Sequence, residues 1–176
     1  MVSSVLIQRL KQAIAVYPDF PKEGISFKDI MPVLADPGLF ADVVESFCEM
    51  PSIRDSEAIV GIDARGFILA SAIALRCRKP LLAARKPGKL PGLLLNKSYD
   101  LEYGRGELAM QTELTANFNS FAIVDDLLAT GGTANAAVQI IKDLNKPVLG
   151  VCVLVELAAL GGVDCVDARV ESILKY

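Results

Sequence analysis

The chain has 176 residues, of which 52% are hydrophobic, and a formal net charge of −3. This length suits one domain of about 100–200 residues, and the absence of histidine excludes Ser-His-Asp and Cys-His catalysis as well as histidine-ligated metals. No apolar run approaches the roughly 18 residues that cross a membrane and no secretion signal is visible, so a cytoplasmic protein is expected.

Positive charge is concentrated in one stretch of the sequence. Residues 64–99 contain eight cations and no acidic residue, whereas the remainder has ten cations and 21 acids. A positive belt in an otherwise acidic protein indicates a small polyanionic ligand and argues against nucleic-acid binding. The four cysteines form no Cys-x-x-Cys pair, so reduced thiols are expected.

Helix and strand patterns alternate through the first half of the chain. Apolar residues at helical spacing predict a first helix with Ser3 or Ser4 as its cap. A segment rich in Pro, Gly, Asp and Lys follows it and is expected to be irregular. In chain order the predictions are a helix at 5–16, the irregular segment 17–37, a helix at 39–50, a strand at 57–62, a helix at 67–76 and a strand at 80–84.

The second half of the chain continues the alternation after a loop and a hairpin. Strands that alternate with helices predict an α/β fold, in which a mainly parallel sheet has helices on both faces. Ligands of such sheets bind at the carboxyl ends of the strands. The predicted elements are the loop 85–92, hairpin strands at 93–103 and 107–113 joined across 104–106, a strand at 121–125, a helix at 135–144, and strands at 148–155 and 170–174.

The most informative segment is 124–133, Val-Asp-Asp-Leu-Leu-Ala-Thr-Gly-Gly-Thr, which lies between an apolar run and a helix. Carboxylates at a strand end accept hydrogen bonds from sugar hydroxyls, so Asp125 and Asp126 are assigned to a ribose. The following loop offers backbone N–H groups beside a helix N-terminus, which suits a monophosphate. It is neither a Walker loop nor a dinucleotide fingerprint. The residues assigned to the phosphate are Ala129, Thr130, Gly131, Gly132 and Thr133.

This segment resembles the 5-phosphoribosyl-1-pyrophosphate (PRPP) signature of the type I phosphoribosyltransferases, in the form carried by the adenine-specific members. The resemblance implies the fold of that family: a central, mainly parallel sheet flanked by helices, an N-terminal hood and a flexible loop hairpin. It also implies one domain over 1–176, with a helix and hood at 1–34 and a flexible catalytic loop at 85–107.

Two further segments resemble the parts of the family that hold pyrophosphate. Residues 61–67, Gly-Ile-Asp-Ala-Arg-Gly-Phe, resemble its pyrophosphate loop, in which Arg65 supplies a forked donor. Many members have Ser in place of Ala64. Residues 85–92 resemble the basic loop whose cations, in the family, bind pyrophosphate in the neighbouring subunit of a dimer. The implied pyrophosphate residues are Ala64, Arg65, Arg85, Lys86 and Lys89, with Arg65 also counted as catalytic.

The segment 98–104 resembles the family's flexible Tyr-x-Leu-Glu-Tyr-Gly sequence. The resemblance implies that Glu102 is the acid–base or electrostatic catalyst and that Tyr103 covers the closed site. With histidine absent, a carboxylate on a loop is a reasonable source of acid–base chemistry. The alternative for Glu102 is an exposed charge on a hairpin.

Residues 19–30 resemble the hood that lies over the base in relatives. The resemblance implies that Phe27 stacks on the purine and that the adenine-binding residues are Ile25, Ser26, Phe27 and Lys28. Many relatives have Pro in place of Glu23 and a larger apolar residue in place of Ser26, which leaves the strictness of base selection open. The alternative for Phe27 is a core aromatic.

The resemblance implies a purine salvage enzyme that converts adenine and PRPP to AMP and pyrophosphate. It implies a homodimer and Mg²⁺ held by PRPP and water, without a dedicated protein site. Two alternatives are a transferase for another purine base and a non-catalytic PRPP or purine sensor. A pyrophosphokinase-like protein is a third, although it would be longer and would need a second nucleotide site.

Overall fold

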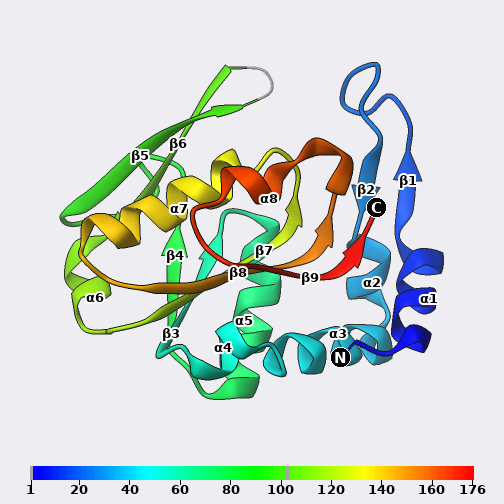
Figure 1. Cartoon of the computed structure of the whole chain (residues 1–176), viewed down its shortest axis with the longest axis horizontal. Helices are drawn as coiled ribbons and strands as arrows, with labels where there is room; N and C mark the ends of the chain where they lie inside the picture. The colour runs from blue at the N-terminus through cyan, green and yellow to red at the C-terminus, as the bar shows by residue number, and fades with distance from the viewer. Residues whose placement is uncertain (1, 102–103) are drawn as a thin grey trace. The chain divides into compact units, whose positions relative to one another are not determined.

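The computed structural model describes residues 2–101 and 104–176. The chain divides into two compact units, Met1–Ser46 and Phe47–Tyr176. Figure 1 shows the order of the elements along the chain. The expected division into one domain with a hood at 1–34 stays a prediction.

The first unit contains short helices and a two-stranded antiparallel hairpin. Helix α1 begins where the Ser3 hydroxyl accepts a hydrogen bond from the Leu6 N–H at 3.1 Å. It ends at Ala13 rather than Val16, because the next residues are extended and pair with a later strand. The prediction of a helix to Val16 and of an irregular segment after it is therefore wrong at this point. The elements are α1 (Ser4–Ala13), β1 (Ala15–Tyr17), β2 (Phe27–Asp29), α2 (Met31–Ala35) and α3 (Pro37–Cys48), the last of which ends in the second unit.

The second unit is built on a five-stranded sheet in which every neighbouring pair is parallel. The strand order is β4-β3-β7-β8-β9, which confirms the predicted α/β fold. Because β3 leads to one side and β7 to the other, the order reverses between them, and ligands bind at such a point. The strands are β3 (Ala58–Ile62), β4 (Leu81–Ala84), β7 (Phe121–Leu128), β8 (Val148–Glu156) and β9 (Val170–Lys175).

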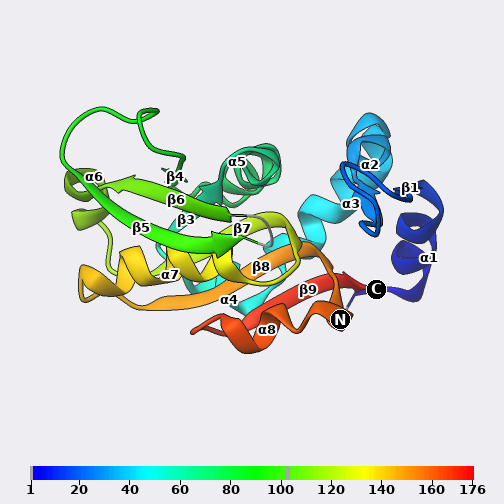
Figure 2. The ribbon, with the colours of Figure 1, turned by 90° about the horizontal axis from the view of Figure 1, so that it is seen from above.

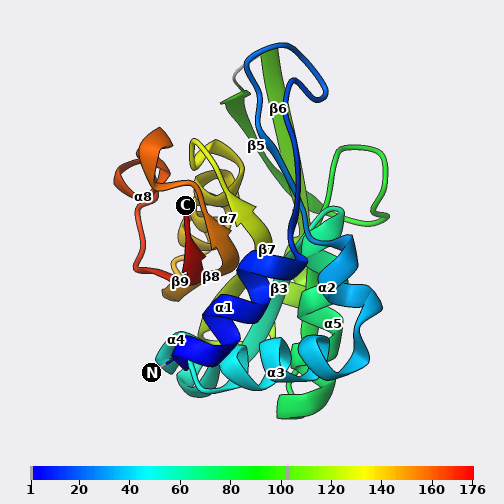
Figure 3. The same ribbon diagram turned by 90° about the vertical axis from the view of Figure 1, so that its right-hand side faces the viewer.

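Helices cover both faces of this sheet. Figure 2 shows α5 and α7 on opposite sides of it, as right-handed crossovers in opposite directions require. Figure 3 shows α8 beside the first turn of α7. None of the helices in the described part of the chain has the length and apolar character needed to cross a bilayer. The helices are α4 (Pro51–Asp55), α5 (Arg65–Cys77), α6 (Thr112–Ala116), α7 (Gly132–Asp143), the 3-10 turn η1 (Ala158–Leu160) and α8 (Gly162–Cys165).

The hairpin of β5 (Leu94–Leu101) and β6 (Gly104–Gln111) packs against α7. Lys97 forms an ion pair with Asp143 of that helix at 2.7 Å. The predicted turn across 104–106 is wrong, because both glycines lie in β6. Gly106 is paired with Tyr99, and a Cβ at Gly106 would lie 2.4 Å from the tyrosine ring. A glycine there makes room for an aromatic ring on the facing strand and does not mark a turn.

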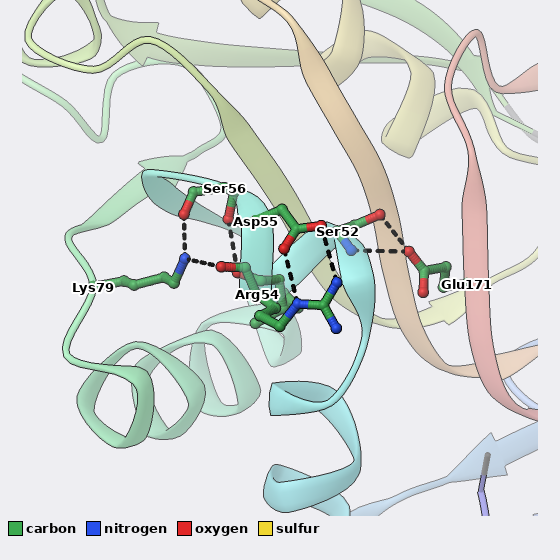
Figure 4. A network of polar contacts seen from close by, with 7 residues as sticks. Ser52, Arg54, Asp55, Ser56, Lys79 and Glu171 are labelled. Atoms are coloured by element: carbon green, nitrogen blue, oxygen red, sulfur yellow. Dashed lines mark hydrogen bonds and ion pairs between the residues drawn. The ribbon is translucent and has the colours of Figure 1, made fainter.

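Structural polar contacts hold the amino ends of the strands (Figure 4). The backbone N–H of Ser52 donates to Glu171 at 3.2 Å, which links α4 to β9. Lys79, just before β4, donates to the carbonyl oxygens of Arg54, at 2.8 Å, and Ser56. These contacts lie at the amino ends of the strands, and ligands of such sheets bind at the opposite, carboxyl ends.

The four cysteines are free in the structure, and reduced thiols stay an expectation. Cys152 is buried in β8, and that burial raises the pKa of its thiol. The sulfur atoms of Cys48 and Cys77, at the ends of α3 and α5, lie 2.9 Å apart. Cys165, in α8, is exposed.

Candidate active site

The two predicted ribose carboxylates lie within β7 and not in a loop after it, because this strand continues to Leu128. Asp126 is 5% exposed and Asp125 is partly buried. Asp125 Oδ1 accepts the backbone N–H of Asp126 at 2.8 Å, which orients the first carboxylate. A strand holds both groups more rigidly than a loop would, and this suits recognition of vicinal hydroxyls.

Arg65, the first residue of α5, lies directly beside this pair. Its Nε is 2.9 Å from Asp126 Oδ2, so the predicted pyrophosphate loop and the predicted ribose carboxylates form one cluster. The same Oδ2 is buried and accepts no well-aligned hydrogen bond from the described residues. A buried carboxylate oxygen without such a donor is costly, and the charge of Arg65 beside it offsets part of that cost.

Burial controls the protonation of the carboxylate pair. Burial first, and the neighbouring Asp126 charge second, raise the pKa of Asp125 well above its ordinary value. Burial also raises the pKa of Asp126, although the Arg65 guanidinium opposes the change. Burying the ionised carboxylates is costly, and a cation or several hydroxyl donors placed against the pair would offset that cost. This is the arrangement expected of a ligand site.

The predicted phosphate loop surrounds a cavity of about 200 Å³ that also reaches Asp125. Helix α7 begins after Gly131, whose φ of +85° places the backbone in the left-handed region that glycine tolerates. No side chain caps this helix, so its first-turn N–H groups point to the cavity with the positive end of the helix dipole. All five predicted phosphate residues line this cavity, together with Leu127, Leu128 and Ala134.

Gly66 explains how α5 comes so close to β7. A Cβ at this position would lie 2.8 Å from Asp125 Oδ1 and 2.9 Å from the Val124 carbonyl oxygen. Only hydrogen fits there, so the helix start that carries Arg65 lies directly against the carboxylates. This role of Gly66 is not evident from the sequence alone.

Arg85 faces the same loop from the end of β4. Its Nε lies 3.3 Å from Asp63 Oδ2, and its guanidinium is 5.5 Å from the centre of the Phe67 ring. Arg85 thus contacts the predicted pyrophosphate loop, residues 61–67, of its own chain. Lys86 and Lys89 are exposed in the loop that follows, and Ala64 is exposed at the N-cap of α5. Asp63 lies at a strand end, where ligands of such sheets bind, but no role was assigned to this carboxylate from the sequence.

The hood residues belong to the first unit and form an aromatic site of their own. Phe27 meets Phe20 edge to face, with ring centres 5.3 Å apart. A cavity of about 270 Å³ is lined by Tyr17, Phe20, Phe27 and Asp29. Phe27 is partly exposed and lines this cavity, which argues against the core alternative. The sequence analysis missed Tyr17 and Phe20 because the segment was expected to be irregular.

The other predicted hood residues have local partners. The Ile25 carbonyl accepts the Phe20 N–H at 3.2 Å and closes the loop between β1 and β2. The Ser26 hydroxyl accepts a hydrogen bond from Lys28 Nζ at 3.3 Å. Glu102 and Tyr103, predicted for catalysis and for covering the site, lie outside the described residues.

A second cavity, of about 330 Å³, lies beside the phosphate loop on the hairpin side. Thr130 and Gly132 line both cavities, and the exposed Cys165 lines the second. Among the residues described, no group of three or more cysteine and carboxylate side chains is arranged to hold a metal ion.

Residues 49–168 match the phosphoribosyl transferase domain family. A carboxylate pair and an anion-binding loop, placed where the strand order of a parallel sheet reverses, are in keeping with this class of protein. The chain is 48% identical over 168 residues to adenine phosphoribosyltransferase of Prochlorococcus marinus (strain AS9601), covering 96% of this chain and 99% of the relative. The chain therefore belongs to the adenine phosphoribosyltransferase family, as the sequence resemblance predicted.

Solved structures agree with this assignment. The adenine phosphoribosyltransferase of Rhodothermus marinus DSM 4252 has a TM-score of 0.89 at 36% identity, with 99% of this chain and 100% of that chain covered. The Saccharomyces cerevisiae enzyme, solved with an imino-altritol bisphosphate and adenine, has a TM-score of 0.86 at 33% identity, with 98% and 100% covered. The predicted fold of the type I phosphoribosyltransferases is thus confirmed.

Proposed function

We propose that this protein transfers the 5-phosphoribosyl group of PRPP to adenine and releases AMP and pyrophosphate. The observation that carries the proposal is the carboxylate pair of β7, which continues directly into an open phosphate loop and lies against Arg65. The relatives named for the same reaction support it, because they match the hood segment as well as the PRPP segment.

The reaction breaks the bond between ribose C1 and pyrophosphate and forms a bond between C1 and adenine N9, which loses a proton. Asp125 and Asp126 hold the ribose hydroxyls, and their negative charge favours the cationic C1 of the transition state. The loop Ala129–Thr133 holds the 5-phosphate through backbone N–H groups. Arg65, Arg85, Lys86 and Lys89 stabilise the departing pyrophosphate.

We further propose that Arg85 acts in its own subunit, because it contacts Asp63 of the same chain. Glu102 is retained as the acid–base or electrostatic group and Tyr103 as a cover, on the resemblance alone. A cytoplasmic location rests on the reduced thiols.

Magnesium suits this site as a companion of PRPP. The carboxylates of β7 provide oxygen donors next to a place for phosphate oxygens, which fits an ion that binds through one or two carboxylates, substrate phosphates and water. Bound there, Mg²⁺ would neutralise pyrophosphate charge. Asp125 and Asp126 are the residues whose charge would favour the ion there.

The hood supplies the base site in this proposal, and Phe27→Ala tests it. Loss of the ring removes a stacking surface for adenine, so the KM for adenine is expected to rise roughly 10- to 100-fold. The KM for PRPP should stay within about twofold, because the PRPP residues belong to the other unit. Steady-state kinetics with each substrate varied in turn checks this.

Val16→Ala is the matched control, because Val16 lies on the same hairpin and does not line the aromatic cavity. It should leave both KM values unchanged. An unchanged adenine KM in a folded Phe27→Ala variant would contradict the assignment of the hood.

We propose that the protein is a homodimer that uses the outer face of α5. Leu75 is 82% exposed there, Ile68 on the same face is 41% exposed, and Leu81 on the edge strand β4 is also 41% exposed. Such a group of apolar side chains favours contact with a second copy. Leu75→Glu is expected to convert the dimer to a monomer in multi-angle light scattering, because the charge would be buried in the interface.

Val5→Glu is the control for this experiment, because Val5 is 66% exposed and lies in the other unit. A wild-type protein that is monomeric at assay concentration would contradict the dimer. A Leu75→Glu variant that remains dimeric would place the interface elsewhere.

A radiolabelled-base assay with PRPP and Mg²⁺ tests the main proposal. Adenine, hypoxanthine, guanine and xanthine are compared at matched concentration, and AMP from adenine alone is expected. Turnover of an oxopurine instead would overturn the base assignment and leave the PRPP site intact. PRPP binding without any turnover would favour the sensor alternative.

A further inference from the structure

The segment after β8 packs directly against the back of the phosphate loop. It comprises η1, Gly161 and the start of α8, and Figure 3 shows it beside the first turn of α7. Both facing glycines, Gly131 in the loop and Gly162 in α8, are buried. Two stretches of backbone therefore meet here without an intervening side chain.

The fit is tight from both sides. A Cβ on Gly162 would lie 2.1 Å from the Ala129 carbonyl oxygen and 3.0 Å from the Gly131 nitrogen. A Cβ on Gly131 would lie 2.4 Å from the Gly162 carbonyl oxygen. Because the obstacles are backbone atoms and not flexible side chains, a methyl group at position 162 requires the phosphate loop or α8 to move.

The segment that carries Gly162 is fixed on its other sides. The Leu157 N–H donates to the Leu128 carbonyl at 2.9 Å, at the point where β7 enters the phosphate loop. The Ala158 N–H donates to the Tyr176 carbonyl at 2.9 Å, and the Tyr176 N–H donates to Glu156, also at 2.9 Å. These bonds resist a retreat of the segment, so a side chain at Gly162 would displace the phosphate loop.

We propose that Gly162 is a positioning residue for PRPP, which acts by fixing Ala129 and Gly131 so that the loop N–H groups converge on the 5-phosphate. This inference rests on the proposed function, in which that loop holds the 5-phosphate. Gly162 lines neither of the two cavities at the phosphate loop, so its effect is expected on the substrate that carries this phosphate. A misplacement of about 1 Å in a binding group is enough to cost roughly 100-fold.

The neighbouring glycine provides a matched control. Gly161 has a φ of +64°, a region that Asn tolerates, and a Cβ there would meet nothing within 4 Å. Gly161→Asn thus adds a larger side chain one residue away, in open space. Any effect of Gly162→Ala that Gly161→Asn lacks is due to contact with the phosphate loop.

The experiment compares wild type, Gly162→Ala and Gly161→Asn. We expect Gly162→Ala to raise the KM for PRPP roughly 10- to 100-fold and the inhibition constant of ribose 5-phosphate in parallel, with the adenine KM within about twofold. Gly161→Asn should match the wild type. An unchanged PRPP KM, or equal changes in both KM values together with a lower Tm, would overturn the proposal.

A second variant covers the case in which Gly162→Ala does not fold. Removal of the terminal Tyr176 frees the Ala158 anchor, and we expect a smaller, PRPP-selective rise in KM. No rise in this variant would count against the proposal. Failure of the proposed function can be told apart from failure of the Gly162 proposal. If the proposed function is wrong, the wild type lacks adenine turnover. The effect of Gly162→Ala on ribose 5-phosphate binding can still be measured by calorimetry in that case.

Discussion

Replacement of Asp125 and Asp126 together by Asn is expected to abolish PRPP binding. Both carboxylates lie on β7 beside the phosphate loop, and each charge-assisted hydrogen bond contributes about 1.5–3 kcal/mol. Loss of two such acceptors lowers kcat/KM for PRPP by roughly 10²–10⁴-fold. Isothermal calorimetry with PRPP and Mg²⁺ checks binding apart from turnover, and retained affinity would contradict the ribose assignment.

The single variant Asp125→Asn is expected to lose activity and gain stability. Burial raises the pKa of this carboxyl in the folded state, so ionising it at neutral pH costs folding free energy. The free energy of unfolding is therefore highest while the carboxyl is protonated and falls as the pH rises through the raised pKa. Asn avoids that cost and keeps an acceptor for the Asp126 N–H. A rise in Tm of a few degrees is expected, since about 1 kcal/mol corresponds to roughly 2–4 °C at this chain length.

The pH dependence of the wild type follows from the same shift. As pH falls, PRPP affinity should decline at a higher pH than for ordinary carboxylates, because both pKa values are raised.

The Tm of the Asp125→Asn variant has its own contradicting outcome. A lower Tm for this variant than for wild type at neutral pH would show that burial of the charge without ligand is not costly.

Gly66→Ala is expected to reduce kcat/KM for PRPP by roughly 100-fold, although it adds only one methyl group. The new Cβ would lie 2.8 Å from Asp125 Oδ1 and 3.1 Å from Asp125 Cα. To relieve this steric clash, the start of α5 must move away from β7. This movement separates Arg65 from Asp126. A displacement of this kind costs transition-state stabilisation of about the predicted size.

Ser71→Ala is a suitable control, because Ser71 lies on α5, is exposed, and is remote from the helix start. It should leave PRPP kinetics unchanged. A Gly66→Ala variant with normal PRPP kinetics would show that α5 and β7 separate without consequence.

Residues that are adjacent in the chain could be expected from the sequence to lie at one place, although their roles stay predictions. Asp125, Asp126 and the loop at 129–133 are adjacent in the chain, and the structure gathers the loop and Asp125 around one cavity. Arg65 was predicted from a separate motif, and its contact with Asp126 joins the two. The parallel sheet followed from the alternation of strands and helices, since crossover rules leave few arrangements.

Sequence reasoning failed where a residue's role depends on a partner distant in the chain. Gly106 was assigned to a turn because glycine is common in turns, whereas it makes room for Tyr99 on the facing strand. Gly162 carries no local signal, because its constraint is the carbonyl of Ala129. The end of α1 was misplaced because β1 pairs with β2, a tertiary effect that overrides helical spacing.

The position of Cys165 gives this enzyme a site for a spectroscopic reporter. Cys165 is the most exposed of the four thiols and lines a cavity with Thr130 and Gly132 of the phosphate loop. A thiol-reactive fluorophore would attach there selectively and sense the loop as phosphate binds. Because the chain contains no tryptophan, a single tryptophan introduced in the hood would report adenine binding against a dark background. Because the two reporters emit at different wavelengths, occupancy of the two substrate sites can be followed separately in one sample.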